Sequence, residues 1–293
     1  MYANELSETE TPEPVVDVLR TISEEERNLR NMRKAIRTIE RLTENEPSNN
    51  IYKMKQELMK IEKILKQTRL TDLIEEDVEQ RIRPVKSEMP EWEEQANRSF
   101  GQRLEDALEQ VDFELSGNYP LLKVLFYTLE VKLYNNSVTI WYGPQQEQLD
   151  TCKPIPEVVA KKLLASHKKI TSRNFDDETF LLHLFEAYKA TAHRHNKKIG
   201  DSISVSDIIL EYALLTQNKN FKINPVKSSY REYGRVFFSY DLYRLTQRTI
   251  EDHVLSLVTA TRAYTTRRSG FLWIPSNERG DGTYISHIKF REV

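Results

Sequence analysis

The N-terminal third of the chain carries apolar residues at helical spacing. Two runs recur every three or four positions, and a break at residues 44–50 that contains Pro47 separates them. The first run comprises Leu29, Met32, Ile36 and Ile39, and the second comprises Ile51, Met54, Leu58, Ile61 and Leu65. Charged residues flank both narrow stripes, so we predict an antiparallel, coiled-coil-like helical hairpin that packs along this seam or binds a partner. The alternative is an ordinary amphipathic helix pair packed within its own domain.

Turn formers and prolines set the expected limits of this helical region. Residues 1–17 are polar and contain prolines, which predicts a disordered lead-in. Ser23 precedes three glutamates, a pattern typical of a helix start because the side chain caps free amides and the carboxylates face the positive end of the dipole. A third helix is expected over about residues 90–111, after Pro84 and Pro90.

Strict alternation of apolar and polar residues follows over about residues 122–142 and predicts a β-hairpin. Asn135 and Asn136 tolerate the positive φ that a two-residue turn needs. Such a turn would pair Leu133 with Val138, Val131 with Ile140, and Leu129 with Tyr142, which places all six side chains on one face.

The rest of the chain predicts a mixture of helices and strands. We expect helices near 156–170 and 177–198, with Gly200 after the second, and a short helix capped by Ser204 or Ser206. We expect a strand over 235–242, a helix rather than a strand over 249–265, and two final strands, 271–274 and 284–290, joined by a polar loop. The predicted fold is therefore α+β: a helical arm over residues 18–111, then an α+β domain over residues 112–293 with a C-terminal wing.

Charge and composition narrow the function classes. Forty-three Lys and Arg oppose 45 Asp and Glu, but residues 1–111 carry a net charge of −7 and residues 112–293 a net charge of +5. The single cysteine, Cys152, excludes an internal disulfide and a cysteine-based metal site, and no phosphate-binding glycine motif occurs. We therefore expect no cofactor and no metal. Since no apolar run could span a bilayer and the N-terminus lacks a signal-peptide core, we expect a cytoplasmic protein without a membrane partner.

One pattern resembles a catalytic motif. Glu130-Val131-Lys132 matches the acid–residue–lysine order on a strand of restriction-type nucleases, in which the acid binds Mg²⁺ and the lysine polarises the attacking water. The nearest upstream acid is Asp112. The alternation favours a simpler interpretation, in which Glu130 and Lys132 form an ordinary charge ladder on the polar face of the hairpin, and we expect no catalytic residues.

Basic residues near the C-terminus suggest nucleic-acid binding as a further alternative. A helix that ends in arginines and leads into two strands resembles the end of a winged-helix module, where such side chains contact phosphates. The candidate residues are Arg262, Arg267, Arg268, Arg279 and Lys289. They could equally pair with the domain's own acids or with an acidic partner.

A family resemblance rests on Gly117-Asn118-Tyr119-Pro120, the hairpin, and Trp141-Tyr142-Gly143-Pro144. This stretch, within residues 112–190, resembles accessory subunits of bacterial Lamassu-type anti-phage and anti-plasmid defence systems, which are encoded beside SMC-like ATPases. The resemblance implies a non-enzymatic subunit that bridges an SMC-like ATPase and a nuclease, and restrains the nuclease until foreign DNA ends are sensed. Three hypotheses result: an accessory subunit, a Mg²⁺-dependent nuclease, and a module that contacts double-stranded DNA directly.

Overall fold

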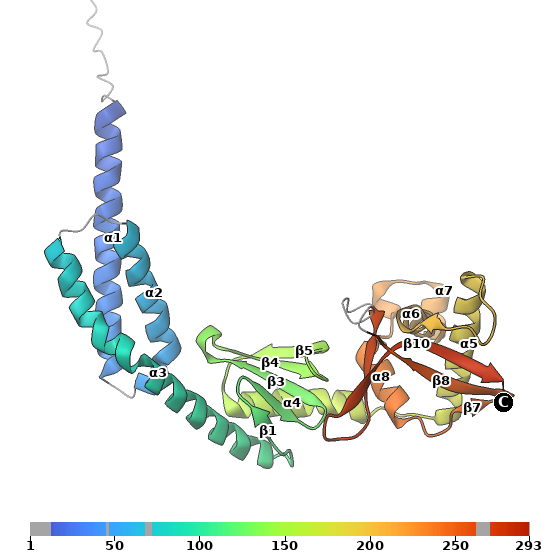
Figure 1. The fold of residues 1–293 in the computed structure, drawn as a ribbon. Helices are drawn as coiled ribbons and strands as arrows, with labels where there is room; N and C mark the ends of the chain where they lie inside the picture. Colours follow the sequence, from blue (N-terminus) through green and yellow to red (C-terminus); the bar gives the residue numbers. More distant parts are fainter. Residues whose placement is uncertain (1–12, 45–46, 68–71, 262–269, 293) are drawn as a thin grey trace, which may run out of the picture. The chain divides into compact units, whose positions relative to one another are not determined.

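The computed structural model describes residues 13–44, 47–67, 72–261 and 270–292. The chain divides into two compact units, of which the first comprises Met1–Gly101 and Leu133–Asn136, and the second Gln102–Lys132 and Ser137–Val293. Helices dominate the first unit, while the second combines helices with two antiparallel sheets (Figure 1). The predicted α+β class is therefore confirmed.

Three long helices build the first unit. They are α1 (Glu13–Thr43), α2 (Ile51–Gln67) and α3 (Asp72–Glu109), and the 3₁₀ turn η1 (Pro47–Asn50) joins the first two. The expected hairpin of α1 and α2 is present, but its seam packs against α3 as well. The shared core includes Met32 and Ile39 of α1, Met54 and Ile61 of α2, and Ile82 of α3. Three helices that pack together bury more apolar surface than an isolated pair. The seam therefore lies in the interior of a small three-helix bundle.

Two expected helix limits are wrong. Ser23 lies inside α1, which starts at Glu13, and its hydroxyl donates to the Leu19 carbonyl at 2.9 Å instead of capping the helix. The third helix starts at Asp72 rather than near residue 90, and it contains both Pro84 and Pro90. Tertiary packing explains the second difference, because Val78, Ile82, Val85 and Met89 are buried at helical spacing around the prolines.

The first sheet of the second unit is a five-stranded meander. Its strands, in spatial order, are β1 (Ser116–Asn118), β2 (Leu121–Val124), β3 (Tyr127–Lys132), β4 (Ser137–Tyr142) and β5 (Glu147–Cys152). The helix α4 (Pro156–Thr171) runs along the sheet (Figure 1). The Tyr127 hydroxyl lies 3.2 Å from His167 Nδ1, and Lys162 donates to Asp150 at 2.8 Å, so polar contacts tie α4 to β3 and β5.

The predicted hairpin is confirmed, with a different turn and register. Val131 faces Val138, Leu129 faces Ile140 and Tyr127 faces Tyr142, which is a shift of two residues from the expected pairing. The strands are joined by a 3₁₀ turn, η2 (Leu133–Asn135), and only Asn136 then takes a positive φ of 51°. Leu133 belongs to this longer turn, so the pairing of the two strands is shifted by two residues. Because side chains alternate between the two faces of a sheet, a shift by two residues keeps every side chain on its expected face.

The second sheet and its helices complete the second unit. The strands are β6 (Ile203–Ser204), β7 (Thr249–Ile250), β8 (His253–Thr259), β9 (Leu272–Pro275) and β10 (Gly282–Glu292), and long β10 pairs with β6, β8 and β9. The helices are α5 (Asp177–Arg194), α6 (Val205–Leu215), α7 (Lys219–Ile223) and α8 (Arg235–Arg244), and the 3₁₀ turn η3 spans Lys227–Ser229. One hydrophobic core joins α5, α6 and α8 to the second sheet, and it includes Phe185 and Tyr188 of α5, Phe238 of α8 and Phe290 of β10.

Two expectations for this region are wrong. Residues 235–242 form helix α8 instead of a strand, because Phe238, Asp241, Leu242 and Leu245 are buried with helical rather than alternating spacing. Within 249–265, the described residues form β7 and β8 instead of a helix, since β8 pairs with the central strand β10. In addition, α5 ends at Arg194, before the expected limit. The two final strands and the polar loop between them are confirmed.

Candidate protein-interaction surface

The N-terminal half of α1 exposes apolar side chains. Val18 and Leu19 are each 57% exposed, Ile22 is 49% exposed and Leu29 is 40% exposed. Val18, Ile22 and Leu29 continue the helical spacing of the buried residues further along α1, at multiples of three or four positions. In Figure 1, the N-terminal part of α1 runs on beyond α2 and α3, and none of the described helices covers it. An apolar stripe that starts in solvent and enters a core is typical of a helix-binding surface.

A groove between α1 and α3 extends the exposed stripe. Its volume is about 330 Å³, and Leu29, Met32 and Ile36 of α1 and Val78 of α3 form its apolar lining. The rim is charged: Arg33 and Arg37 lie on the α1 side, Asp77 lies on the α3 side, and Arg81 Nη1 donates to Glu40 Oε1 at 2.9 Å. The groove therefore offers apolar contact with two cations beside it.

The structure divides the nine predicted seam residues into three groups. Met32, Ile39, Ile51, Met54, Leu58 and Ile61 are buried in the core of the bundle. Ile36 and Leu65 are partly buried against that core. Leu29 is exposed, so it is the seam residue most available to a partner.

Glu130 and Lys132 contact each other on the polar face of β3. Lys132 Nζ lies 2.6 Å from Glu130 Oε1, and Trp141 Nε1 donates to Glu130 Oε2 at 3.2 Å. This is the charge ladder that the alternation favoured. Within the described ranges, no three His, Cys, Asp or Glu side chains are placed to hold a metal ion together. The two charges of this motif thus pair with each other on the sheet.

The predicted basic residues near the C-terminus are not gathered into one described site. Arg262, Arg267 and Arg268 lie outside the described residues. Arg279 is exposed in the loop between β9 and β10, whereas Lys289 lies within β10 opposite Ser256 of β8. The expected winged-helix arrangement is wrong in one respect, because strand β8 occupies the place of the helix that should precede the wing.

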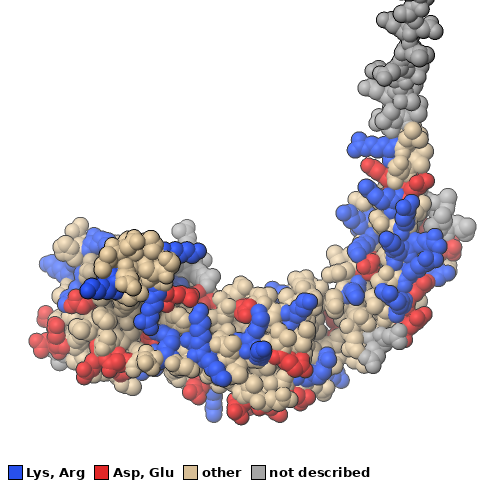
Figure 2. Space-filling view, turned by 180° about the vertical axis from the view of Figure 1, so that it is seen from behind, with Lys and Arg blue, Asp and Glu red and all other residues tan. Residues whose placement is uncertain are grey.

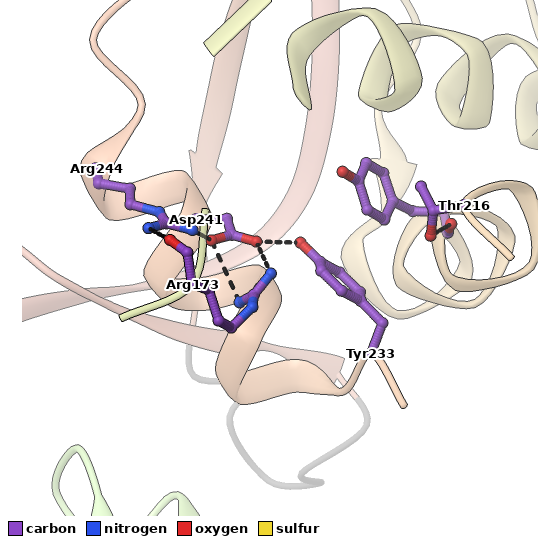
Figure 3. Close-up of polar contacts among 6 residues, drawn as sticks. Arg173, Thr216, Tyr233, Asp241 and Arg244 are labelled. Carbon is purple, nitrogen blue, oxygen red and sulfur yellow. Dashed lines mark hydrogen bonds and ion pairs between the residues drawn. The ribbon is translucent and has the colours of Figure 1, made fainter. Parts of the chain in front are cut away.

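A buried charge cluster in the second unit escaped sequence analysis. Asp241 is 1% exposed and accepts hydrogen bonds from Arg173 Nη2 at 2.8 Å, Arg244 Nη2 at 2.6 Å and Tyr233 Oη at 2.6 Å (Figure 3). Burial raises the pKa of the Tyr233 hydroxyl, and nearby Tyr212 and Asp241 raise it further, so Tyr233 stays a donor. The expected strand over 235–242 concealed this cluster, because Asp241 and Arg244 adjoin only in a helix.

A cavity of about 350 Å³ adjoins this cluster. Arg173, Phe180, Tyr212, Tyr233 and Asp241 contribute to its wall. The Arg173 guanidinium lies 4.4 Å from the centroid of the Phe237 ring, which holds the arginine against an aromatic surface. Since Asp241 already accepts from three side chains, the arrangement fits a structural tie between α8 and the segment before α5.

Comparisons of the chain with known proteins found no match. No protein-family model matches the chain, and neither a curated protein nor a solved structure is significantly similar to it. Among the described helices, none is both long enough and apolar enough to cross a membrane.

Proposed function

We propose that this chain is a non-catalytic accessory subunit that uses its helical unit to dock a partner protein. The observation that carries the proposal is Leu29: it is a large apolar side chain, exposed at the mouth of a groove whose floor is the core of the bundle. A helix from a partner would bury Leu29, Ile22 and Val18 together and extend the three-helix bundle by a fourth helix.

The rim of the groove specifies the chemistry of that partner helix. Arg33 and Arg37 flank the apolar floor, and neither forms an ion pair with a described carboxylate. An amphipathic helix that carries Asp or Glu beside its apolar stripe would match both features. The resemblance over residues 112–190 suggests that the partner is an SMC-like ATPase, and that the second unit contacts an effector nuclease of a DNA-sensing defence complex.

Co-purification of the full chain with a candidate SMC-like ATPase and a candidate nuclease from its own host tests the proposal. Leu29→Glu places a carboxylate in the groove and is expected to reduce capture of the ATPase at least tenfold, because one desolvated charge costs several kcal/mol. Met59→Glu is the matched control: Met59 is 68% exposed on α2, outside the residues that line the groove.

Three outcomes decide the proposal. Capture by the unchanged chain and by Met59→Glu, with loss for Leu29→Glu, supports it. Equal capture by both variants shows that the groove is not the docking site. A chain that captures neither protein overturns the accessory-subunit assignment. Circular dichroism of both variants shows that the helices are retained.

A further inference from the structure

A second set of side chains on α1 follows a different helical stripe from the apolar one. Residues 27–43 contain six basic residues and one acidic residue, although the net charge of residues 1–111 is −7. Five of the cations recur with a 3-4-3-4 spacing along the helix and are all exposed: Arg27, Arg30, Lys34, Arg37 and Arg41. We call these five residues the basic stripe. Helical geometry places them opposite the buried Met32 and Ile39.

The helical unit separates its charges between helices. Helix α2 carries five lysines and two glutamates, whereas the sequence of α3 has twelve acidic and five basic residues. The acidic excess of the region therefore comes from α3 and from residues 1–26, whereas residues 27–43 of α1 and the helix α2 carry a basic excess. Figure 2 shows Lys and Arg side chains gathered on the helical unit, next to few carboxylates.

The cations of the basic stripe are available to a ligand. Within the described part of the chain, none of the five forms an ion pair with a carboxylate. Lys60 and Lys63 of α2 lie across a groove of about 710 Å³ from Lys34, and among the described carboxylates only Glu57 pairs with one of these three lysines, Lys60, at 2.6 Å. Asn31 and Gln67 add amide donors to the same groove.

We propose that the basic stripe binds the phosphate backbone of duplex DNA. The stripe spans about 21 Å along a straight helix, since fourteen residues each rise about 1.5 Å. Over that length duplex DNA presents on the order of twelve phosphate charges, so each cation has a phosphate within reach. Amide side chains such as Asn31 also donate to phosphate oxygens.

The composition of the stripe favours duplex DNA over other anionic partners. Among the described residues 27–41, Leu29 is the one exposed large apolar side chain, and it lines the groove beside the stripe and not the centre of the stripe, whereas a protein interface needs an apolar centre. Residues 27–43 contain no aromatic residue, whereas non-specific single-strand binding relies on aromatic stacking. Contacts to the backbone alone need only cations and donors, and they would be independent of base sequence.

Fluorescence anisotropy of the purified full chain with a labelled duplex tests this inference. With five phosphate contacts, affinity should fall on the order of 500-fold between about 50 and 200 mM salt. The variant Arg30→Gln/Lys34→Gln/Arg41→Gln keeps two contacts and should lose only about tenfold over the same range, from a weaker starting affinity; it leaves Arg37, which also borders the groove, unchanged. The matched control is Lys161→Gln/Lys168→Gln/Lys219→Gln, which removes three exposed cations of the second unit and should behave as the unchanged chain.

The outcomes separate this inference from the proposed function. Leu29→Glu should leave the salt dependence of DNA binding unaltered, because Leu29 lies outside the basic stripe. No duplex binding at about 50 mM salt, or an unchanged salt slope in the triple Gln variant of the stripe, overturns the inference. Binding of an acidic polypeptide but not of duplex DNA assigns the stripe to a protein partner and also overturns it.

Discussion

Arg173 and Asp241 lie 68 positions apart in the sequence and form an ion pair of 2.8 Å in the second unit. Arg244 holds the other carboxylate oxygen at 2.6 Å, so two guanidinium groups neutralise one buried carboxylate. Asp241→Ala should destabilise the protein by about 3 kcal/mol, because the two arginines and Tyr233 lose their common acceptor. Urea unfolding measures this change.

The exposed ion pair between Lys162 and Asp150 provides the control for that measurement. Its two side chains are each 38% exposed, so Asp150→Ala should cost less than about 1 kcal/mol. Equal losses for the two aspartate variants would show that the Asp241 cluster is not a structural tie.

Gly143 lies against the indole of Trp273. Its φ is +67°, and a Cβ there would lie 2.6 Å from Trp273 Cε3. Gly143→Ala should therefore destabilise the second unit by about 2–4 kcal/mol, through backbone strain and overpacking. Gly101→Ala should instead stabilise the protein by about 0.5–1 kcal/mol, because Gly101 is inside α3 with open space around it. Thermal unfolding measures both changes: the melting temperature should fall for Gly143→Ala and rise for Gly101→Ala.

Pro84 interrupts the hydrogen bonding of α3. It is exposed, and its ring supplies no N–H to the helix. Pro84→Ala should raise the stability of the helical unit by about 1–3 kcal/mol. Thermal unfolding followed by circular dichroism measures the change. A lower melting temperature would indicate instead that the packing of Val78, Ile82 and Val85 depends on the proline.

The stability of the protein should depend on pH through the protonation of His167. Burial lowers the pKa of this imidazole below its ordinary value of 6.5, opposed by Glu278, and the ring packs on Phe113 and Phe126. Between the lowered pKa and 6.5 the unfolded chain binds more protons than the folded chain, so stability is retained above pH 6.5 and falls as the pH drops below it.

Melting temperatures at about pH 7.5 and 5.5 test this linkage. Burial lowers the pKa of His287 as well, so His167→Gln should reduce, without abolishing, the loss of stability on acidification. The variant keeps an acceptor for the Tyr127 hydroxyl. An identical pH profile for the unchanged chain and the variant would contradict the assignment.

The nuclease alternative makes a separate prediction for Glu130. Glu130→Ala removes the contacts to Lys132 and Trp141 and should lower stability by about 1 kcal/mol. Any DNA cleavage by the assembled complex with Mg²⁺ should stay unchanged. Loss of cleavage with unaltered thermal stability would instead make Glu130 a catalytic residue.

Local patterns predicted those elements whose partners lie nearby in the sequence. The α1–α2 hairpin, the β3–β4 hairpin and the two final strands all join segments through short connections, so periodicity and turn chemistry carried enough information. The sequence also places Leu29 on the apolar seam and contains the spacing of the basic stripe, but the exposure of Leu29 comes from the structure. The net charge of residues 1–111 hides the stripe, because it averages the basic residues 27–43 with the acidic residues 1–26 and acidic α3.

The elements that depend on distant partners were decided by the tertiary structure. Residues 235–242 alternate like a strand but lie in α8, since Phe238 packs in a core shared with α5, α6 and β10. Residues 253–259 form a strand because β10, which follows after more than twenty residues, offers its backbone hydrogen bonds. The third helix of the bundle and the Asp241 cluster arise in the same way. Burial against segments far along the chain outweighs local propensity, because the free energy of packing exceeds the small intrinsic preferences of single residues.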